Sequence, residues 1–311
     1  MSVPYTLLWI VQIVLVPACS PLIFGVVRKM KARFQNRVGA SVLQPYRDLW
    51  KLFHKDEVIS HDASWVFRLA PIVLFGVSIV VGASIPLFST LFFGLPTSDL
   101  LVIVYCIALG TFFLALAGMD TGNAFGGFGS SREMTVAALT EGGLIFSLFA
   151  VALVAHTTNL FGMVRALSSV PLFSYPPILL AFCAFVIALL AETARFPFDN
   201  PATHLELTMI HEAMILEYSG PRLALIEWAA ANKFLIFLSL AANLFFPWGI
   251  GSSLAWSVLA IAFVGWVMKV LLLCIFVAVL ESSTAKFRFF RLPDLLFTSF
   301  VLSVIAIGLI L

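Results

Sequence analysis

Eight long apolar segments follow one another along the chain, and charged residues gather almost entirely between them. The segments cover about residues 3–27, 66–93, 99–117, 136–156, 176–194, 222–246, 253–280 and 292–311. A bilayer core about 30 Å thick is crossed by roughly 20 apolar residues in a helix, and only helices or closed barrels satisfy the backbone inside lipid. The pattern predicts an all-α, polytopic membrane protein with eight transmembrane helices in a single membrane domain, residues 1–311.

The composition supports this prediction and narrows the function classes. Hydrophobic residues make up 61% of the 311 residues and charged residues 11%. Soluble domains are about 45–50% apolar and about 25% charged, so a soluble globular domain is excluded. The net charge of +2 gives no indication of nucleic-acid binding. The four cysteines lie singly in apolar segments, without the C-x-x-C spacing of iron–sulfur or zinc sites, so we expect neither kind of site in this chain.

Basic residues lie almost entirely in alternate connections between the apolar segments. The connections at about 28–65, 118–135, 195–221 and 281–291 hold or directly border fourteen of the 18 lysines and arginines, whereas the others hold only Arg165. Lysine and arginine concentrate in the cytoplasmic loops of membrane proteins. The sequence therefore predicts that these connections, three of them substantial, are cytoplasmic and that both termini lie on the outer, periplasmic side.

Several ionisable residues lie inside the apolar segments or at their cytoplasmic ends. A charge at the middle of a membrane helix costs about 2.5–3.5 kcal/mol on insertion scales, so such groups usually pair or line a hydrated route. Lys233 is about 16 Å from the cytoplasmic end of its segment, close to the midplane. We interpret the set as a proton or cation path entering from the cytoplasm, with interhelical ion pairs that only fix packing as the alternative. Its members are Glu141, Glu227, Lys233, Lys269 and Glu281.

The connection that follows the fifth segment is rich in acid. It holds five of the 16 carboxylates and two of the five histidines, namely Glu192, Asp199, Glu206, Glu212, Glu217, His204 and His211. The uninterrupted stretch from Ala202 to Tyr218 predicts a helix with mixed faces, enclosed by protein. A zinc-protease motif H-E-x-x-H is excluded because its second histidine would be Ile215. Since histidine titrates near neutral pH, we expect proton relay or hydrogen bonding from this connection.

The first and third connections are candidate docking surfaces. The first is longer than topology requires and mixes basic, polar and aromatic residues. The candidate docking residues, all from the first connection except the last, are Arg33, Arg37, Gln44, Tyr46, Arg47, Asp48, Lys51 and Arg132. A soluble partner is the favoured interpretation, and attraction of the basic residues to anionic lipid is the alternative. The glycine-rich third connection, 118–135, predicts flexible backbone close to a partner or ligand.

These connections together resemble one family of membrane subunits. The runs Gln35-Asn36-Arg37-Val38-Gly39 and Gln44-Pro45-Tyr46-Arg47-Asp48 resemble the first cytoplasmic loop of the membrane H subunit (subunit 1) of respiratory complex I. Asp120-Thr121-Gly122 and Gly129-Ser130-Ser131-Arg132-Glu133 are similar to the third loop of its hydrogenase branch, which includes formate hydrogenlyase subunit 4 and hydrogenase-4 component C. Arg195-Phe196-Pro197-Phe198-Asp199 and Glu217-Tyr218-Ser219-Gly220 are similar to the fifth-loop signature of both.

The resemblance implies a heel subunit in a bacterial or archaeal cytoplasmic membrane. It implies partners that include soluble hydrogenase-like large and small subunits, an iron–sulfur protein and antiporter-like membrane subunits. Iron–sulfur clusters and a nickel–iron centre would lie in those partners, and this chain would hold no redox cofactor, no metal ion and no complete active site. Glu141, Asp199 and Glu206 match acidic positions of the family, whereas Ala202 and His204 stand where complex I has further acids. That departure favours ferredoxin- or formate-linked chemistry, with a quinone-chamber subunit of a complex I-like dehydrogenase as the alternative.

Overall fold

The structure, a computed structural model, describes residues 3–92, 96–169, 176–199 and 209–311. Eleven α-helices occur in these ranges, and no β-strand does, apart from two isolated bridges. The long helices are α1 (Val3–Phe34), α3 (Trp65–Ser84), α4 (Leu100–Asp120), α5 (Ala124–Ala155), α7 (Pro176–Glu192), α9 (Gly220–Leu240), α10 (Trp256–Ser283) and α11 (Leu292–Ile310). The short ones are α2 (Gln44–Phe53), α6 (Leu160–Leu167) and α8 (His211–Ile215), and α9 continues into a π-helical turn, Ala241–Phe245.

Among the described helices, seven are long and apolar enough to cross a membrane, which confirms an all-helical, multi-pass membrane protein. They are α1, α3, α4, α5, α10, α11 and α9 with its π-helical turn. The remaining predicted span corresponds to α7, which is apolar but has 17 residues.

Two predicted boundaries differ from the structure for local reasons. The segment expected at 66–93 ends as a helix at Ser84, because Ile85 precedes Pro86 and takes an extended conformation with ψ 147°. The segment expected at 136–156 begins as a helix at Ala124, where the side chain of Asn123 caps it by accepting a hydrogen bond from the Phe125 N–H at 3.0 Å. The third connection is therefore mostly helical, and the prediction of a flexible glycine-rich loop was wrong.

The glycines of that segment allow α4 and α5 to approach closely. A Cβ atom on Gly126 would lie 2.1 Å from the carbonyl oxygen of Gly118, so only glycine fits there. By contrast, Gly127 faces open space, where an added Cβ atom would meet nothing within 4 Å. The tight α4–α5 hairpin brings the first turns of α5 into the bundle instead of leaving them in solvent.

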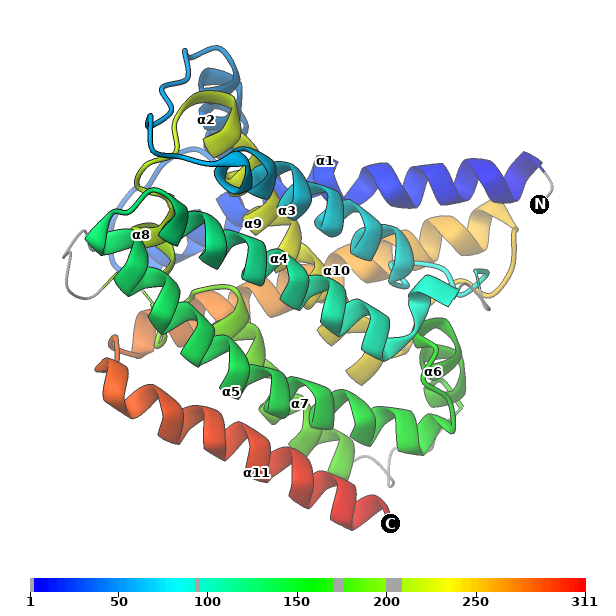
Figure 1. Cartoon of the computed structure of the whole chain (residues 1–311). Helices are drawn as coiled ribbons and strands as arrows, with labels where there is room; N and C mark the ends of the chain where they lie inside the picture. The colour runs from blue at the N-terminus through cyan, green and yellow to red at the C-terminus, as the bar shows by residue number, and fades with distance from the viewer. Residues whose placement is uncertain (1–2, 93–95, 170–175, 200–208) are drawn as a thin grey trace.

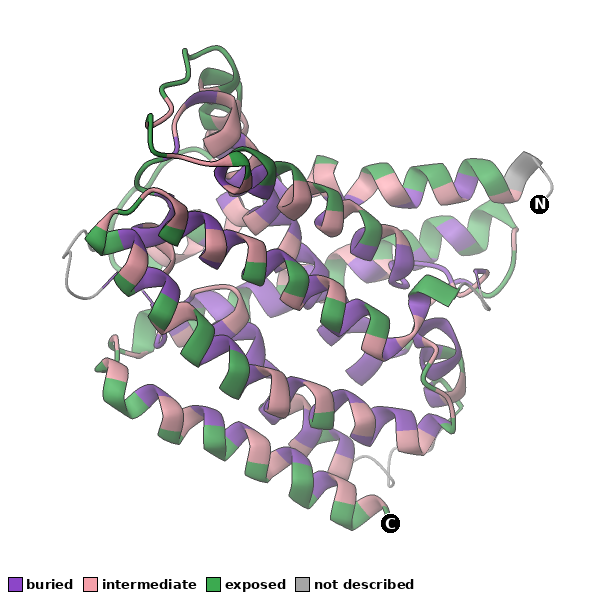
Figure 2. Cartoon of the chain, in the orientation of Figure 1, coloured by how far each residue is buried: buried purple, intermediate pink, exposed green. Residues whose placement is uncertain are grey.

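The helices form one bundle whose centre is α9 (Figure 1). α9 packs against α1 and α3, α4 lies between α3 and α5, and α5 packs against α7 and α11. Buried residues concentrate on α7 and α9, whereas α10 and α11 are largely exposed along one side (Figure 2). The first turn of α1 and the last turn of α11 lie at one end, while α2, α8 and the α10–α11 connection lie at the other (Figure 1). The basic connections thus share one end of the bundle.

Prolines inside α1 create the attachment points for neighbouring elements. Pro21 has no N–H, so it leaves the carbonyl oxygen of Pro17 without its helical donor. The indole N–H of Trp228 on α9 donates to that oxygen at 2.8 Å. One residue further on, the hydroxyl of Tyr46 donates to the carbonyl oxygen of Ala18 and holds α2 against α1.

Candidate functional site

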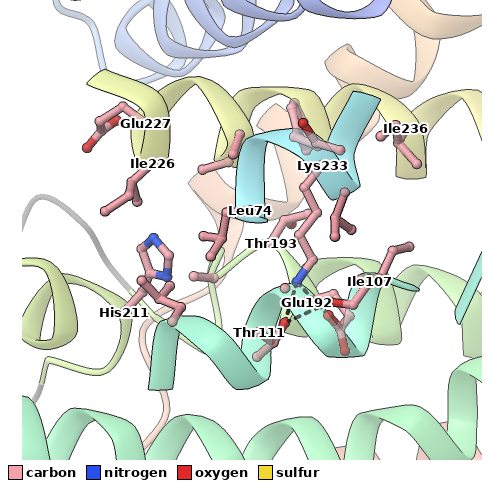
Figure 3. A pocket seen from close by; sticks show the side chains of 18 of the residues that line it. Leu74, Ile107, Thr111, Glu192, Thr193, His211, Ile226, Glu227, Lys233 and Ile236 are labelled. Carbon is pink, nitrogen blue, oxygen red and sulfur yellow. Dashed lines mark hydrogen bonds and ion pairs between the residues drawn. The ribbon is translucent and has the colours of Figure 1, made fainter. Parts of the chain in front are cut away.

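A cavity with eight ionisable residues in a largely apolar wall lies in the half of the bundle that carries the basic connections. Its walls come from α1, α3, α4, α5, α7, α8 and α9 (Figure 3). Its volume is about 130 Å³. One water molecule requires roughly 10–15 Å³ and two or more polar partners, so the cavity has room for several ordered waters. Ionisable lining residues are Arg28, Glu133, Glu192, Asp199, His211, Glu212, Glu227 and Lys233.

The ammonium group of Lys233, in the middle of α9, lies in the cavity wall. Its Nζ lies 2.7 Å from Oε2 of Glu192, at the end of α7, and donates to the hydroxyl of Thr111 on α4 at 3.2 Å (Figure 3). The Glu192 side chain is 7% exposed and that of Lys233 is 22% exposed. The pair joins the middle of α9 to the beginning of the acidic connection.

Asp199 organises the acidic connection around both of its carboxylate oxygens. Oδ1 accepts from Nζ of Lys286 at 2.7 Å, and Oδ2 accepts the backbone N–H groups of Ile210 and His211 at 3.3 and 3.1 Å. Asp199 is buried. One carboxylate therefore holds the start of α8 in place at the cavity and ties it to the connection between α10 and α11.

The two side chains that begin α8 have strongly altered proton affinities. Burial lowers the pKa of His211 to about 4, although the charge of Asp199 acts in the opposite direction. Burial, together with the negative charges of Glu227 and Asp199, raises the pKa of Glu212 to about 7, against the lowering effect of Arg28. His211 is thus neutral at pH 7, whereas Glu212 is close to half-protonated. A carboxyl group that titrates at neutral pH suits proton transfer.

A buried cluster behind the cavity joins three further elements. Glu281, near the end of α10, accepts from Arg195 at 2.7 Å and lies 3.1 Å from Nζ of Lys31 on α1. The guanidinium of Arg195 also stacks over the ring of Phe234, 3.6 Å from its centre. Because Phe234 follows Lys233 directly, this cluster fixes the helix turn that carries the central lysine.

A second pocket adjoins the cavity at α2. Its volume is about 230 Å³, and it is lined by residues of α1, α2 and α9, including Asp48. Phe24, Arg28 and Glu227 line both spaces. Glu227 therefore borders the second pocket as well as the cavity.

Three comparisons with known proteins decide the family. A family model described as NADH dehydrogenase matches residues 6–311. The chain belongs to the NADH dehydrogenase family.

Relatives within this family share most of their length with the chain. It is 33% identical to formate hydrogenlyase subunit 4 of Escherichia coli K12 over 303 residues, which covers 96% of both chains. It is 35% identical to hydrogenase-4 component C of the same organism over 298 residues, or 95% of this chain and 92% of the relative. The membrane-bound sulfane sulfur reductase, an archaeal respiratory membrane complex, contains a chain of the same fold, with a TM-score of 0.81, 22% identity and coverage of 98% and 99%.

The H subunits of NADH-quinone oxidoreductases from Symbiobacterium thermophilum and Thermomicrobium roseum are also similar over most of the chain, at 29% and 30% identity. They cover 92% and 86% of it, and 90% and 83% of their own length. The resemblance seen in the sequence motifs, to this complex I family in its hydrogenase branch, is confirmed.

Most of the predicted path residues converge in space, and their roles remain predictions. Glu192, Asp199, His211, Glu212, Glu227 and Lys233 line the cavity, and Glu281 lies directly behind it through Arg195. Glu141 on α5 is outside the cavity wall but within electrostatic reach of Glu192 and Lys233. His204 and Glu206 lie outside the described residues, as do residues 202–208 of the helix predicted from 202 to 218. In the described remainder, residues 209–218, only His211–Ile215 (α8) is α-helical, so the prediction of one uninterrupted helix was wrong there.

Two predicted path residues are placed elsewhere. Lys269 donates to the carbonyl oxygen of Phe246 at 2.7 Å, beyond the π-helical turn that ends α9, and does not line the cavity. Glu217 is exposed and accepts from the side-chain amide of Asn123 at 2.7 Å. A charge in or near an apolar segment does not say which neighbour it faces, so the sequence could not separate these two residues from the others.

The motif around Glu217 has a structural use in this fold. The hydroxyl of Tyr218 donates to the carbonyl oxygen of Phe67 at 2.8 Å, and the two rings stack with centroids 3.9 Å apart. Ser219 exchanges hydrogen bonds with the backbone of Val58 at 2.9 and 3.1 Å. Gly220 has φ +54°, where its missing side chain leaves room for the carbonyl oxygen of Lys55. These contacts fasten the acidic connection to the first connection.

Sequence reasoning missed two ionisable residues of the cavity, Arg28 on α1 and Glu133 on α5. Glu133 belongs to the motif Gly129-Ser130-Ser131-Arg132-Glu133, which was assigned to a loop, whereas α5 already begins at Ala124. The charges of Lys233, Glu192 and Asp199 all act on it. The cap at Asn123 was the signal that places this glutamate on a helix.

The predicted docking residues divide into two groups. Arg33, Arg37, Arg47, Asp48 and Lys51 are exposed, and Gln44 donates to Asp48 at 2.8 Å within α2. Tyr46 binds α1, as described above. Arg132 donates to the carbonyl oxygen of Met209 at 3.2 Å and lies over the ring of Phe289, so its contacts lie within the chain. In the described ranges, no group of three His, Cys, Asp or Glu residues is placed to hold a metal ion.

Proposed function

We propose that this chain is the membrane subunit that anchors the soluble redox arm of an energy-converting, hydrogenase-type complex and couples electron transfer to proton or sodium translocation. The observation that carries the proposal is the group of ionisable side chains that meet in one cavity. It joins the acidic connection, at the surface, to the Lys233–Glu192 pair inside the bundle. The relatives from hydrogenase-4 and formate hydrogenlyase support the same assignment over nearly the whole chain.

We infer eight membrane spans, with α7 as the eighth, in a bacterial or archaeal cytoplasmic membrane. At 1.5 Å per residue, 17 residues span about 25 Å, and helices of this length lie at the lower end of the range that crosses a bilayer. α7 packs between α5 and α11, both of which are long enough to cross. An even number of spans and the basic residues at one end support cytoplasmic placement of α2 and α8, with both termini outside.

The coupling follows from charge exchange between the acidic connection and the cavity. A cluster held by the soluble arm would add negative charge near α8 when reduced, and that charge would favour protonation of Glu212. A proton on Glu212 removes one repulsive charge beside Glu227 and Asp199, the two carboxylates whose charges act on it. The altered field acts on the Lys233–Glu192 pair and on Glu133, and through that pair it reaches Glu141 on α5.

The chemistry of electron transfer belongs to partners under this proposal. Iron–sulfur clusters and a nickel–iron centre would lie in hydrogenase-like soluble subunits, and antiporter-like membrane subunits would adjoin the bundle. The exposed basic and aromatic residues of α2 and the end of α1, Arg33, Arg37, Arg47, Trp50 and Lys51, support docking of the soluble arm there. The names of the relatives favour the hydrogenase branch over the quinone-chamber alternative.

The test uses the intact complex in sealed vesicles, with electron transfer and ion transport measured together. Glu192→Gln, Glu212→Gln and Glu141→Gln should each reduce ion transport severely while the complex assembles and still transfers electrons. Glu217→Gln is the matched control, because Glu217 belongs to the same connection but hydrogen-bonds Asn123 outside the cavity. Normal transport in the Glu192 and Glu212 variants would refute the proposed path.

A further inference from the structure

The connection between α10 and α11 combines arginine and phenylalanine in a short turn. Residues 286–291 read Lys-Phe-Arg-Phe-Phe-Arg, and Phe289–Arg291 form a 3₁₀ turn closed by the Arg291 N–H donating to the Arg288 carbonyl oxygen at 2.9 Å. A turn of four residues brings the Cα atoms of its first and last residues within about 7 Å of each other. Arg288 and Arg291 therefore lie close together at the two ends of this turn.

The contacts of this segment divide it into an anchored part and an open part. Lys286 binds Asp199, the Phe287 N–H donates to the Pro197 carbonyl oxygen at 3.0 Å, and Phe289 lies under Arg132. Arg288 and Arg291 are exposed, and neither forms an ion pair with a described residue within 4.0 Å, including Asp294 in the first turn of α11. Phe290, between them, is 89% exposed.

The surroundings of the turn indicate which part of the membrane it contacts. α10 and α11 are the most exposed of the long helices, and their outward faces are apolar, with Phe276, Val279 and Phe297 each more than 40% exposed. The turn joins these two faces at the end of the bundle that carries the other basic connections (Figure 1). Aromatic residues followed by basic residues at the end of a lipid-facing helix mark the boundary between acyl chains and headgroups.

We propose that Arg288 and Arg291, with Phe290, form a binding site for the phosphate of an anionic phospholipid. Two guanidinium groups at the ends of one tight turn match a phosphodiester, because each can donate two hydrogen bonds to its oxygens. Phe290 would enter the acyl boundary beside the headgroup. The lipid would then hold the connection that also carries Lys286, the partner of Asp199 at the cavity.

This inference stands apart from the proposed function, since it requires only that the chain lies in a membrane. The test is native mass spectrometry of the full chain, titrated with phosphatidylglycerol, phosphatidylcholine or inorganic phosphate. Phosphatidylglycerol should bind selectively, and the double variant Arg288→Gln/Arg291→Gln should bind it about 25-fold more weakly, at roughly fivefold per basic residue. Arg33→Gln/Arg37→Gln is the control, because it removes the same charge from another exposed part of the same end.

Equal weakening in both double variants would reduce the effect to general surface charge and overturn the site. Undiminished binding in Arg288→Gln/Arg291→Gln would overturn it as well. Binding of inorganic phosphate alone, without added benefit from the acyl chains, would remove Phe290 and lipid from the proposal. Protection of residues 288–291 by a neighbouring subunit in the delipidated complex would show that protein, not lipid, covers the turn. Unchanged helical circular dichroism confirms that the exposed substitutions leave the fold intact.

Discussion

Substitution of Lys233 by methionine tests the central ion pair most directly. Methionine is of similar length and removes only the charge and its hydrogen bonds. At 2.7 Å, two unit charges attract by about 6 kcal/mol at an effective dielectric constant of 20. Loss of water from the two groups offsets most of that attraction, so the intact pair adds little net stability. Removal of one partner is different, because it leaves the carboxylate of Glu192 buried without a counter-charge.

The expected loss follows from that asymmetry. Breaking a buried pair by deleting one partner costs about 3–5 kcal/mol. Because the Lys233 side chain is 22% exposed, water reaches the cavity, and we expect Lys233→Met to lower the unfolding free energy by about 3 kcal/mol, the lower end of that range. Glu192→Gln in the same chain should recover most of this loss, since the remaining amide carries no charge.

The assay is unfolding of the purified full chain in mixed micelles by increasing SDS, followed by circular dichroism and tryptophan fluorescence. Single and double variants form a double-mutant cycle that isolates the coupling between the two side chains. Lys51→Met on the exposed face of α2 is the control and should change stability by less than about 0.5 kcal/mol. A double variant no more stable than Lys233→Met would show that the Glu192 carboxylate is not what the lysine compensates.

Three further predictions follow from the same structure. Glu212 should give an infrared band of a protonated carboxyl group that disappears with a midpoint near pH 7 and is absent in Glu212→Gln. Because the pKa of Glu212 is raised in the folded protein, the stability that this group adds is complete below about pH 4.5 and is lost as the pH rises through about 7. A midpoint near pH 4.5 would contradict burial of the carboxyl group. Lys286→Gln should lower the unfolding free energy by about 3 kcal/mol, because the buried carboxylate of Asp199 loses its counter-charge. Lys286→Arg keeps the charge and should retain most of the stability. Equal losses in the two variants, measured by SDS titration, would exclude the ion pair as the cause. Gly126→Ala should prevent the close approach of α4 and α5 and reduce the yield of folded protein, whereas the added methyl group of Gly127→Ala meets open space and should leave the yield as in the wild type. The yield of folded protein is measured by size-exclusion chromatography. Because both variants change helix propensity equally, a difference between them reports the steric effect alone.

The elements of the fold were predictable wherever a local pattern is sufficient. Apolar runs located the membrane helices, and single residues at their ends explain the errors. Pro86 ended α3 early, and the Asn123 cap started α5 early. The short helices α2 and α6 were missed because ten and eight residues are too few for a periodic pattern to be distinguished from a polar loop.

The candidate site was predictable in membership but not in pairing. The density of acid between Glu192 and Glu217 pointed to the region that borders the cavity, and Lys233 was recognised as a buried charge. Its partner was not evident, since an apolar segment with one lysine presents many faces to many neighbours. The partner of Lys269 was equally impossible to infer from the sequence. Unlike Lys233, Lys269 binds a backbone carbonyl oxygen beyond the end of α9 and not a carboxylate.

The amino-acid sequence by itself determined that the chain crosses a membrane as helices, that its basic residues gather at one end, and that its loop motifs are those of one family. These properties depend on residues that are neighbours in the chain. Only the tertiary structure decided which charges meet, because the partners are far apart in sequence: 122 residues separate Lys233 from Thr111, and 87 separate Lys286 from Asp199. Helix packing sets those distances, and a cavity large enough for water exists only where several helices leave polar side chains facing a common space.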